Sequence, residues 1–134
     1  MSKLSTTLAE LVSMLESSGI CDDTQITETS FFSTEQFAFK IRTTIFSSLS
    51  FQMRIYYNKG HCDYSYQVFD EEPLCRWDNK EHFPQIKTFP HHCHSIDGSV
   101  VESPLQGNPE YDLQYVLAEL SRLFKPETNQ RSTI

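Results

Sequence analysis

Hydrophobic and polar residues follow one period at the two ends of the chain and a different period between them. At both ends the apolar residues recur every three or four positions, which is typical of one face of an α-helix. The first stripe comprises Leu4, Leu8, Leu11, Val12 and Leu15, and the second comprises Leu113, Val116, Leu117, Leu120 and Phe124. We therefore predict one helix over residues 4–16 and another over residues 109–124.

The second of these helices also carries start and stop signals. Asn108 can cap its N-terminus, and Pro109 suits its first turn. Pro126 lies just past the end of the stripe, where it blocks continuation of the helix. We expect a single domain over residues 1–126, followed by a polar tail over residues 127–134.

Between the two predicted helices the period changes to two. Apolar and polar residues alternate through residues 37–46 and 49–57. The pattern continues through residues 62–69 and 74–78, and residues 26–33 are a candidate first strand. Such alternation is typical of antiparallel strands that bury one face. The predicted fold class is therefore α+β: an antiparallel meander sheet of five or six strands, with the N-terminal and C-terminal helices packed on one face.

The pairing register of the strands follows from which faces must match. A turn over residues 58–61 places Ile55 opposite Tyr64, so that apolar side chains meet on one side of the sheet. A shorter turn would place Ile55 opposite Asp63, which makes a worse core. We therefore predict the longer turn, and a similar one over residues 70–73. The remaining predicted core pairs are Tyr57–Cys62, Met53–Tyr66, Phe51–Val68, Val68–Cys75 and Tyr66–Trp77.

The opposite face of the predicted sheet is polar and carries several charges. Its predicted members are Arg42, Gln52, Arg54, Tyr56, Asp63, Ser65, Gln67, Arg76 and Asp78. One interpretation is a solvated face with weak surface ion pairs, and the other is a binding surface. Arg42 and Arg54 fit either interpretation. For Arg76 and Asp78 we favour a functional role, because a segment rich in histidine follows them directly.

Composition and charge exclude several classes of protein. The 134 residues, 38% of them hydrophobic and 13% aromatic, suffice for one globular domain. The net charge of −7 disfavours direct binding to DNA, which depends on neutralising phosphates. The chain has no membrane-length apolar run and no signal-peptide pattern at its start, so we expect a cytoplasmic protein without membrane contact. The four cysteines form no CxxC pair and are expected to be free thiols.

The histidines are the most distinctive chemical feature of the sequence. Four of the five lie within residues 82–94. If residues 88–94 are extended, His92 and His94 share one face of the strand, while His91 and Cys93 share the other. Histidine changes charge near neutral pH and is the commonest metal ligand. The segment therefore supports two different chemistries.

The first chemistry, which we favour, is metal-independent cleavage of RNA. One histidine acts as general base and another as general acid, while an arginine stabilises the charge that develops on the phosphate. The predicted catalytic residues are Arg76, Asp78, His82, His92 and His94. The predicted substrate-binding residues are Arg42, Arg54, Tyr56, Asn79 and His91. This scheme uses no metal and no other cofactor.

Two alternatives remain open from the residues alone. In one, His82, His92 and His94 bind a zinc ion that activates water, and Asp78 is a further ligand or orients a histidine ring. In the other, the histidines only bond a loop and pack on nearby phenylalanines, and the polar sheet face docks a protein partner without catalysis. The HxH pair does not by itself distinguish these readings.

Three consecutive motifs resemble the TumE family of toxins. They are Tyr64-Ser65-Tyr66, then Arg76-Trp77-Asp78-Asn79 with His82, and then Phe89-Pro90-His91-His92-Cys93-His94. The family carries a Tyr-Ser-Tyr-like strand, an Arg-Tyr-Asp-Asn-Ala-Pro-His-His element and a Phe-Pro-His-His-Lys-His element, in this order. The resemblance covers residues 26–124, including the Leu-rich C-terminal helix.

The resemblance implies a bacterial or archaeal toxin that inhibits growth, and a helix-turn-helix antitoxin as its partner. The activity we expect of it is RNA cleavage or inhibition of translation. Three positions depart from the family pattern. Trp77 stands where Tyr is usual, residues 80–83 keep the first His of Ala-Pro-His-His and lose the second, and Cys93 replaces the Lys of His-Lys-His. Cys93 cannot supply the charge of that Lys, so an inactive relic of a toxin is the noncatalytic alternative.

Overall fold

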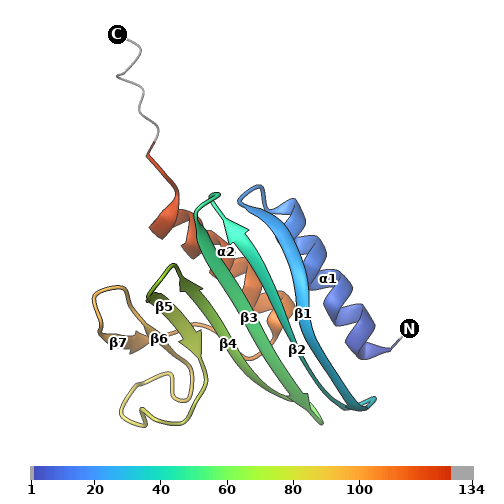
Figure 1. Ribbon diagram of the computed structural model, residues 1–134. Helices are drawn as coiled ribbons and strands as arrows, with labels where there is room; N and C mark the ends of the chain where they lie inside the picture. Colours follow the sequence, from blue (N-terminus) through green and yellow to red (C-terminus); the bar gives the residue numbers. More distant parts are fainter. Residues whose placement is uncertain (1, 128–134) are drawn as a thin grey trace.

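The computed structural model describes residues 2–127 and places two helices behind one sheet (Figure 1). Helix α1 (Lys3–Ser17) precedes the sheet and helix α2 (Pro109–Phe124) follows it. The strands of the described residues are β1 (Cys21–Ser33), β2 (Gln36–Ile45), β3 (Leu49–Asn58), β4 (His61–Phe69), β5 (Pro73–Asp78), β6 (His92–His94) and β7 (Val100–Glu102). The predicted α+β class, with a helix at each end, is confirmed.

The predicted number of strands is wrong, because the described chain forms a meander of seven antiparallel strands in the order β1 to β7. Strands β6 and β7 have three residues each, too short to show a clear alternation. Strand β1 begins at Cys21 and is longer than the candidate strand over 26–33. Almost all of its residues are exposed, so its sequence carries little hydrophobic alternation.

The predicted register in the middle of the sheet is confirmed. Ile55 pairs with Tyr64, and Tyr66 pairs with both Met53 and Trp77. The β3–β4 turn depends on Lys59 and Gly60, which both have a positive φ, as a two-residue hairpin turn requires. Because side chains alternate, this register sends every second residue of β3 to β5 to the helices and the others to the opposite face.

The hydrophobic core lies between the sheet and the two helices. Its strand residues include Phe51, Met53 and Tyr66, which are fully buried. Helix α2 contributes Leu113, Val116 and Leu120, as its apolar stripe predicts, and α1 contributes Leu11 and Leu15. Asn108 caps α2 by accepting a hydrogen bond from the backbone N–H of Tyr111.

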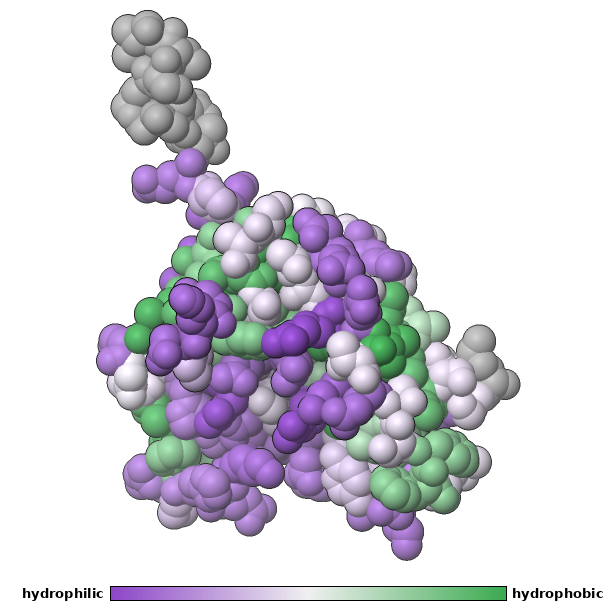
Figure 2. Space-filling model, in the orientation of Figure 1, coloured by the Kyte–Doolittle hydropathy of each residue, from purple (hydrophilic) through white to green (hydrophobic). Residues whose placement is uncertain are grey.

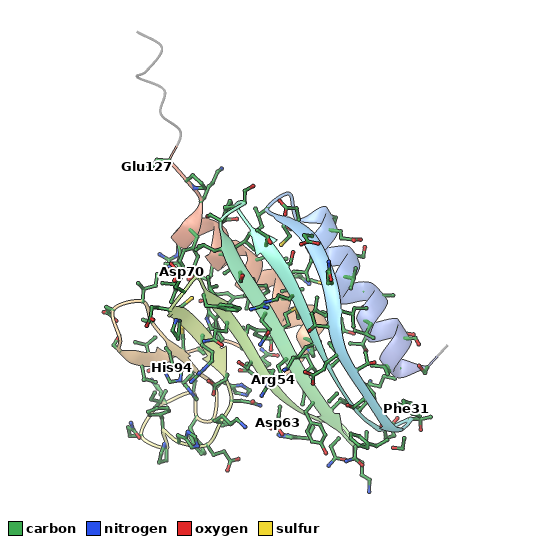
Figure 3. The ribbon with its side chains drawn as sticks, viewed as in Figure 1. Phe31, Arg54, Asp63, Asp70, His94 and Glu127 are labelled. Atoms are coloured by element: carbon green, nitrogen blue, oxygen red, sulfur yellow. The ribbon has the colours of Figure 1, made fainter. Side chains whose placement is uncertain are left out.

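The other face of the sheet is not covered by a helix and is mostly hydrophilic (Figure 2). Figure 3 places Phe31 at one side of the sheet and His94 at the other, with Arg54 between them. We call this surface the open face. No helix in the described part of the chain is long and apolar enough to cross a membrane. Of the predicted tail, only Glu127 lies within the described residues.

Candidate functional site

A groove of about 560 Å³ lies on the open face, over strands β3 to β6. We call it the site groove. The five predicted catalytic residues all line it: Arg76, Asp78, His82, His92 and His94. Its other lining residues are Gln52, Arg54, Tyr56, Asp63, Tyr64, Ser65, Gln67, Asn79 and Lys80. Most of the predicted polar sheet face therefore belongs to one concave surface.

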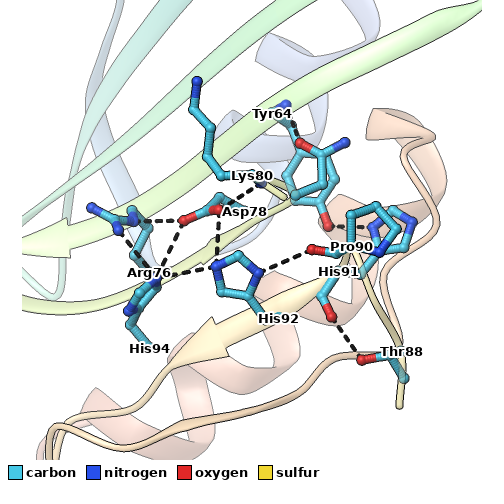
Figure 4. Close-up of polar contacts among 10 residues, drawn as sticks. Tyr64, Arg76, Asp78, Lys80, Thr88, Pro90, His91, His92 and His94 are labelled. Carbon is cyan, nitrogen blue, oxygen red and sulfur yellow. Dashed lines mark hydrogen bonds and ion pairs between the residues drawn. The ribbon is translucent and has the colours of Figure 1, made fainter. Parts of the chain in front are cut away.

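Strand pairing brings the charged residues of the groove together. Asp78 lies opposite His92, and Arg76 lies opposite His94, on the same side of neighbouring strands β5 and β6. The side chain of Asp78 is only 3% exposed. Its carboxylate accepts hydrogen bonds from Arg76 Nε at 2.8 Å and from the backbone N–H of Lys80 at 2.9 Å (Figure 4). These partners compensate for the loss of hydration of a buried charge.

His92 is held rigidly at the bottom of the groove. Its residue is 1% exposed. Its Nδ1 donates to the backbone oxygen of Pro90 at 3.0 Å, since a carbonyl oxygen can only accept. Its Nε2 lies 3.0 Å from Asp78 Oδ1 and 3.2 Å from His94 Nε2. Both ring nitrogens are therefore engaged by the protein, and the ring is not free to turn.

His94 is more open and meets the guanidinium of Arg76. Arg76 Nη2 lies 3.1 Å from His94 Nε2. Because arginine has no acceptor, this contact requires an unprotonated Nε2 on His94. Burial lowers the pKa of His94, and the neighbouring Arg76 lowers it further. Both effects favour the neutral ring, with the lone pair of Nε2 at the groove surface.

The segment after β5 covers this cluster and contributes groups of its own. The Phe83 ring packs edge-on against the rings of His92 and His94, with centroid distances of 4.8 and 5.7 Å. It also contacts His82, whose side chain is exposed and lines the groove. Lys80 is also exposed and lines the groove. Phe83 thus fixes the angle of two histidine rings from outside the sheet.

Asp78, His92 and His94 also form a group with the composition of a metal site. Each offers one ligand atom, and these atoms all lie within 4.8 Å of one another. The set differs from the predicted zinc alternative, because His82 is not among its members. Asp78 takes the third position instead.

Three predicted substrate-binding residues make contacts of another kind. Arg42 stacks over the ring of Phe69 at 4.7 Å and does not line the groove. His91 also lies outside it, where its Nδ1 meets the hydroxyl of Tyr64 at 2.8 Å. Asn79 lines the groove, but its side-chain amide accepts a hydrogen bond from the backbone N–H of Tyr64 and donates one to the backbone oxygen of Cys62. These two bonds attach the chain just after β5 to strand β4. Arg54 and Tyr56, the other two predicted substrate-binding residues, line the groove.

Cys93 points away from the groove. It pairs with Trp77 on the core side of the sheet, opposite to His92 and His94. Burial raises the pKa of its thiol to about 11, so it is protonated at neutral pH and a poor nucleophile. The departure from the family's His-Lys-His pattern therefore removes no charged group from the groove.

Sequence reasoning did not assign Lys80 or the carbonyl of Pro90 to the site, and it named Phe83 only as a packing partner of the histidines in the noncatalytic alternative. They lie in the segment 79–91, which has no regular strand or helix and hence no period that indicates a face. The available signal was their position between the two histidine-bearing motifs. Tyr64 was placed in the core correctly, and its hydroxyl reaches His91 at the rim.

The comparison with family models agrees with the motifs and the geometry. The model described as Toxin TumE matches residues 9–125, which is most of the chain. No curated protein and no solved structure was found to match. A toxin of this kind implies a cognate antitoxin as its partner. The matched region runs from the middle of α1 through the end of α2 and includes the whole site groove, and the chain therefore belongs to the TumE family of toxins.

Proposed function

We propose that the protein is a growth-inhibiting toxin that cleaves RNA in the site groove without a metal ion. In the proposed step, a ribose 2′-OH attacks the adjacent phosphorus, and the bond from phosphorus to the 5′-oxygen of the next nucleotide breaks. The products are a 2′,3′-cyclic phosphate and a free 5′-hydroxyl. This reaction needs a base for the 2′-OH, an acid for the leaving oxygen and cations around the phosphate.

The contact between Arg76 and His94 carries this proposal. It keeps an unprotonated imidazole nitrogen next to a guanidinium at the surface of the groove. A phosphate binds guanidinium in a bidentate manner and more strongly than a neutral ring does. A bound RNA phosphate therefore draws Arg76 away from His94. The released Nε2 then accepts the proton of the 2′-OH.

His82 is the proposed acid, because its side chain is exposed within the groove and close to the cluster. It gives its proton to the leaving 5′-oxygen. His92 is too deeply buried to exchange protons with a substrate. Its role is to hold Asp78 and His94 in place. Arg54 and Lys80 add positive charge along the path of the RNA backbone, despite the negative charge of the whole chain.

A cleavage assay with defined ends tests this mechanism. Purified protein is incubated with single-stranded RNA in the presence of EDTA, and the product ends are mapped. We expect 2′,3′-cyclic phosphate and 5′-hydroxyl ends, and no cleavage where the ribose carries a 2′-deoxy substitution. Products with a 5′-phosphate, or cleavage of the 2′-deoxy substrate, would contradict the proposed step.

Two histidine variants distinguish cleavage in the site groove from cleavage by a contaminating ribonuclease and from a loss of activity through misfolding. His94→Ala should reduce cleavage by at least about 10²-fold, the lower range for removing an acid or base. His61→Ala is the matched control, because His61 is exposed at the β3–β4 turn and does not line the groove. It should cleave like the parent protein.

The same variants extend the test to growth. Induced expression of the protein should arrest a bacterial host, and His94→Ala should relieve the arrest. We infer from the family resemblance that the antitoxin is a helix-turn-helix protein, and its co-expression should also restore growth. The position of Cys93 outside the groove weighs against an inactive relic. Growth arrest that survives replacement of both His94 and Arg76 would favour the noncatalytic binding module instead.

A further inference from the structure

We propose that Asp78, His92 and His94 bind a single Zn²⁺ ion, and that zinc bound there switches the proposed RNA cleavage off. Binding is inferred from the geometry of the three side chains. Inhibition rests on the proposed function, because it assigns the proton-accepting role to His94.

The ligand atoms already lie at distances that suit one ion. His92 Nε2 is 3.0 Å from Asp78 Oδ1 and 3.2 Å from His94 Nε2, and His94 Nε2 is 3.5 Å from Asp78 Oδ2. A tetrahedral zinc ion with bonds of about 2.0–2.1 Å holds its ligand atoms roughly 3.3–3.4 Å apart. The 3.0 and 3.5 Å distances involve different oxygens of Asp78, so the carboxylate must turn for one oxygen to serve as the ligand. One ligand atom from each residue already lies within 4.8 Å of the other two, and together they would fill three of the four zinc positions. The fourth faces the groove and can take water or a phosphate oxygen.

The surroundings of these side chains resemble the outer shell of a metal site. Metal-bound histidines usually donate their second ring nitrogen to a carbonyl or a carboxylate, and bound carboxylates accept further hydrogen bonds. His92 donates Nδ1–H to the backbone oxygen of Pro90, which leaves Nε2 as its only possible ligand atom, and a zinc ion there replaces the proton that Nε2 donates to the Asp78 carboxylate. Asp78 accepts from the Lys80 backbone N–H and from Arg76 Nε. The two most buried ligands are thus oriented before any ion arrives.

Arg76 is the competitor of the ion. Its Nη2 contacts the same His94 nitrogen that zinc would use. The side chain of Arg76 is 40% exposed, so the end of the guanidinium can turn toward the groove. The proposed reaction requires the same movement when a phosphate binds. Zinc and the 2′-OH proton of the substrate therefore compete for the same lone pair, that of His94 Nε2, once Arg76 has moved away from it.

Inhibition follows from this competition. A zinc ion on His94 Nε2 removes the lone pair that would accept the 2′-OH proton, and it fixes His92 and Asp78 around itself. A phosphate that then enters the groove can bind the ion without being cleaved.

Zinc titration calorimetry on the full chain tests binding without reference to activity. We expect one zinc ion per chain for the parent protein, with binding lost in Asp78→Asn and in His94→Gln. His94 is partly exposed, so its replacement leaves the core intact, and circular dichroism checks the fold of each variant. His61→Ala and His82→Ala are the matched controls and should keep the parent stoichiometry. A parent protein that binds no zinc, or a His94→Gln variant that still binds it, would overturn the site.

The cleavage assay then tests the direction of the effect. Equimolar zinc should suppress cleavage by the parent protein at least about tenfold, and EDTA should restore it. Cleavage that requires zinc would overturn both the inhibitory role and the metal-independent reaction. Zinc binding without any change in cleavage would overturn inhibition alone. Absence of zinc binding with normal cleavage in EDTA would overturn this inference and leave the proposed function in place.

Discussion

Two ion pairs on the open face have the same length and opposite surroundings. Near one edge of the sheet, Lys40 Nζ lies 2.8 Å from Glu28, and near the other, Arg76 Nε lies 2.8 Å from Asp78. The Glu28 side chain is 63% exposed, whereas that of Asp78 is 3% exposed. The first pair is a solvated surface contact. In the second, a carboxylate has lost its water and depends on its protein partners.

The difference arises from the chain that follows each strand and not from the strands themselves. Beside Glu28, strand β1 is the open edge of the sheet, and no segment among residues 2–127 buries the Glu28 carboxylate, although the Lys40 side chain is only 23% exposed. Beside Asp78, the segment 79–91 folds back, supplies the Lys80 N–H and leads into β6 with His92. Similar pairs on one face can therefore differ in burial, because an irregular segment decides which of them is covered.

Replacing the two carboxylates should give the largest contrast. Asp78→Ala leaves Arg76 and the buried ring of His92 without their anion, so we expect a loss of about 3 kcal/mol in the free energy of unfolding. Cleavage should be abolished as well. Glu28→Ala should leave the urea midpoint unchanged. Urea denaturation followed by circular dichroism measures both variants.

Asp78→Asn sharpens this comparison, because it keeps the shape of the side chain and removes the charge. It should fold at a urea midpoint between those of the parent and Asp78→Ala. Equal midpoints for Asp78→Ala and Glu28→Ala would show that the two pairs do not differ energetically, and the comparison would fail.

The centre of the sheet could be predicted from sequence because its strands bury one face. In β3 and β4 a one-residue slip would send Asp63 and Ser65 into the core, so only one register satisfies both strands. The same alternation predicted that Arg76 and Asp78 lie on the open face and that His92 and His94 share one face of their strand, as the pairing of β5 with β6 shows. The alternation of side chains alone therefore predicted that most residues of the site groove lie on the same face of the sheet.

The edges of the sheet could not be predicted in the same way. Strand β1 is exposed on both faces, so its sequence does not need to alternate between apolar and polar residues. Strands β6 and β7 are three residues long, less than two full alternations. His91 was expected to bind substrate, and the structure instead pairs it with Tyr64. No periodic rule could have predicted that contact, because His91 lies in the irregular segment just before β6.

Replacing Phe83 should give the next largest effect, because Phe83 is the part of the irregular segment that packs on the rings of both His92 and His94. Phe83→Ala should lower the cleavage rate about tenfold, because small displacements of catalytic groups are costly. Phe83→Leu is the control that keeps bulk against the rings, and it should lose less activity. Rates measured at saturating RNA decide between them. Equal losses in both variants would mean that ring geometry does not depend on this contact.

A smaller effect is expected at the rim, where Tyr64 meets His91. Tyr64→Phe removes one hydrogen bond, which contributes about 1 kcal/mol to the free energy of unfolding. Tyr64 lines the groove, but its hydroxyl bonds His91 outside the groove and its ring is kept in the variant, so the cleavage rate should stay within about twofold of the parent rate. Chemical denaturation and the cleavage assay are run on the same preparation. A large loss of cleavage without a loss of stability would return His91 to the substrate-binding set.

The smallest effect is expected from Arg54, which lies between the two ion pairs in the strand pairing and lines the groove without belonging to the histidine cluster. If it contacts one RNA phosphate, Arg54→Ala should raise KM and leave kcat unchanged. It should also reduce the log–log dependence of RNA binding on salt by about one. Arg42→Ala is the matched control, because Arg42 stacks on Phe69 outside the groove. If Arg42→Ala weakens binding to the same extent, the RNA path extends along the sheet toward the Glu28 pair, and the solvated edge is part of the binding surface after all.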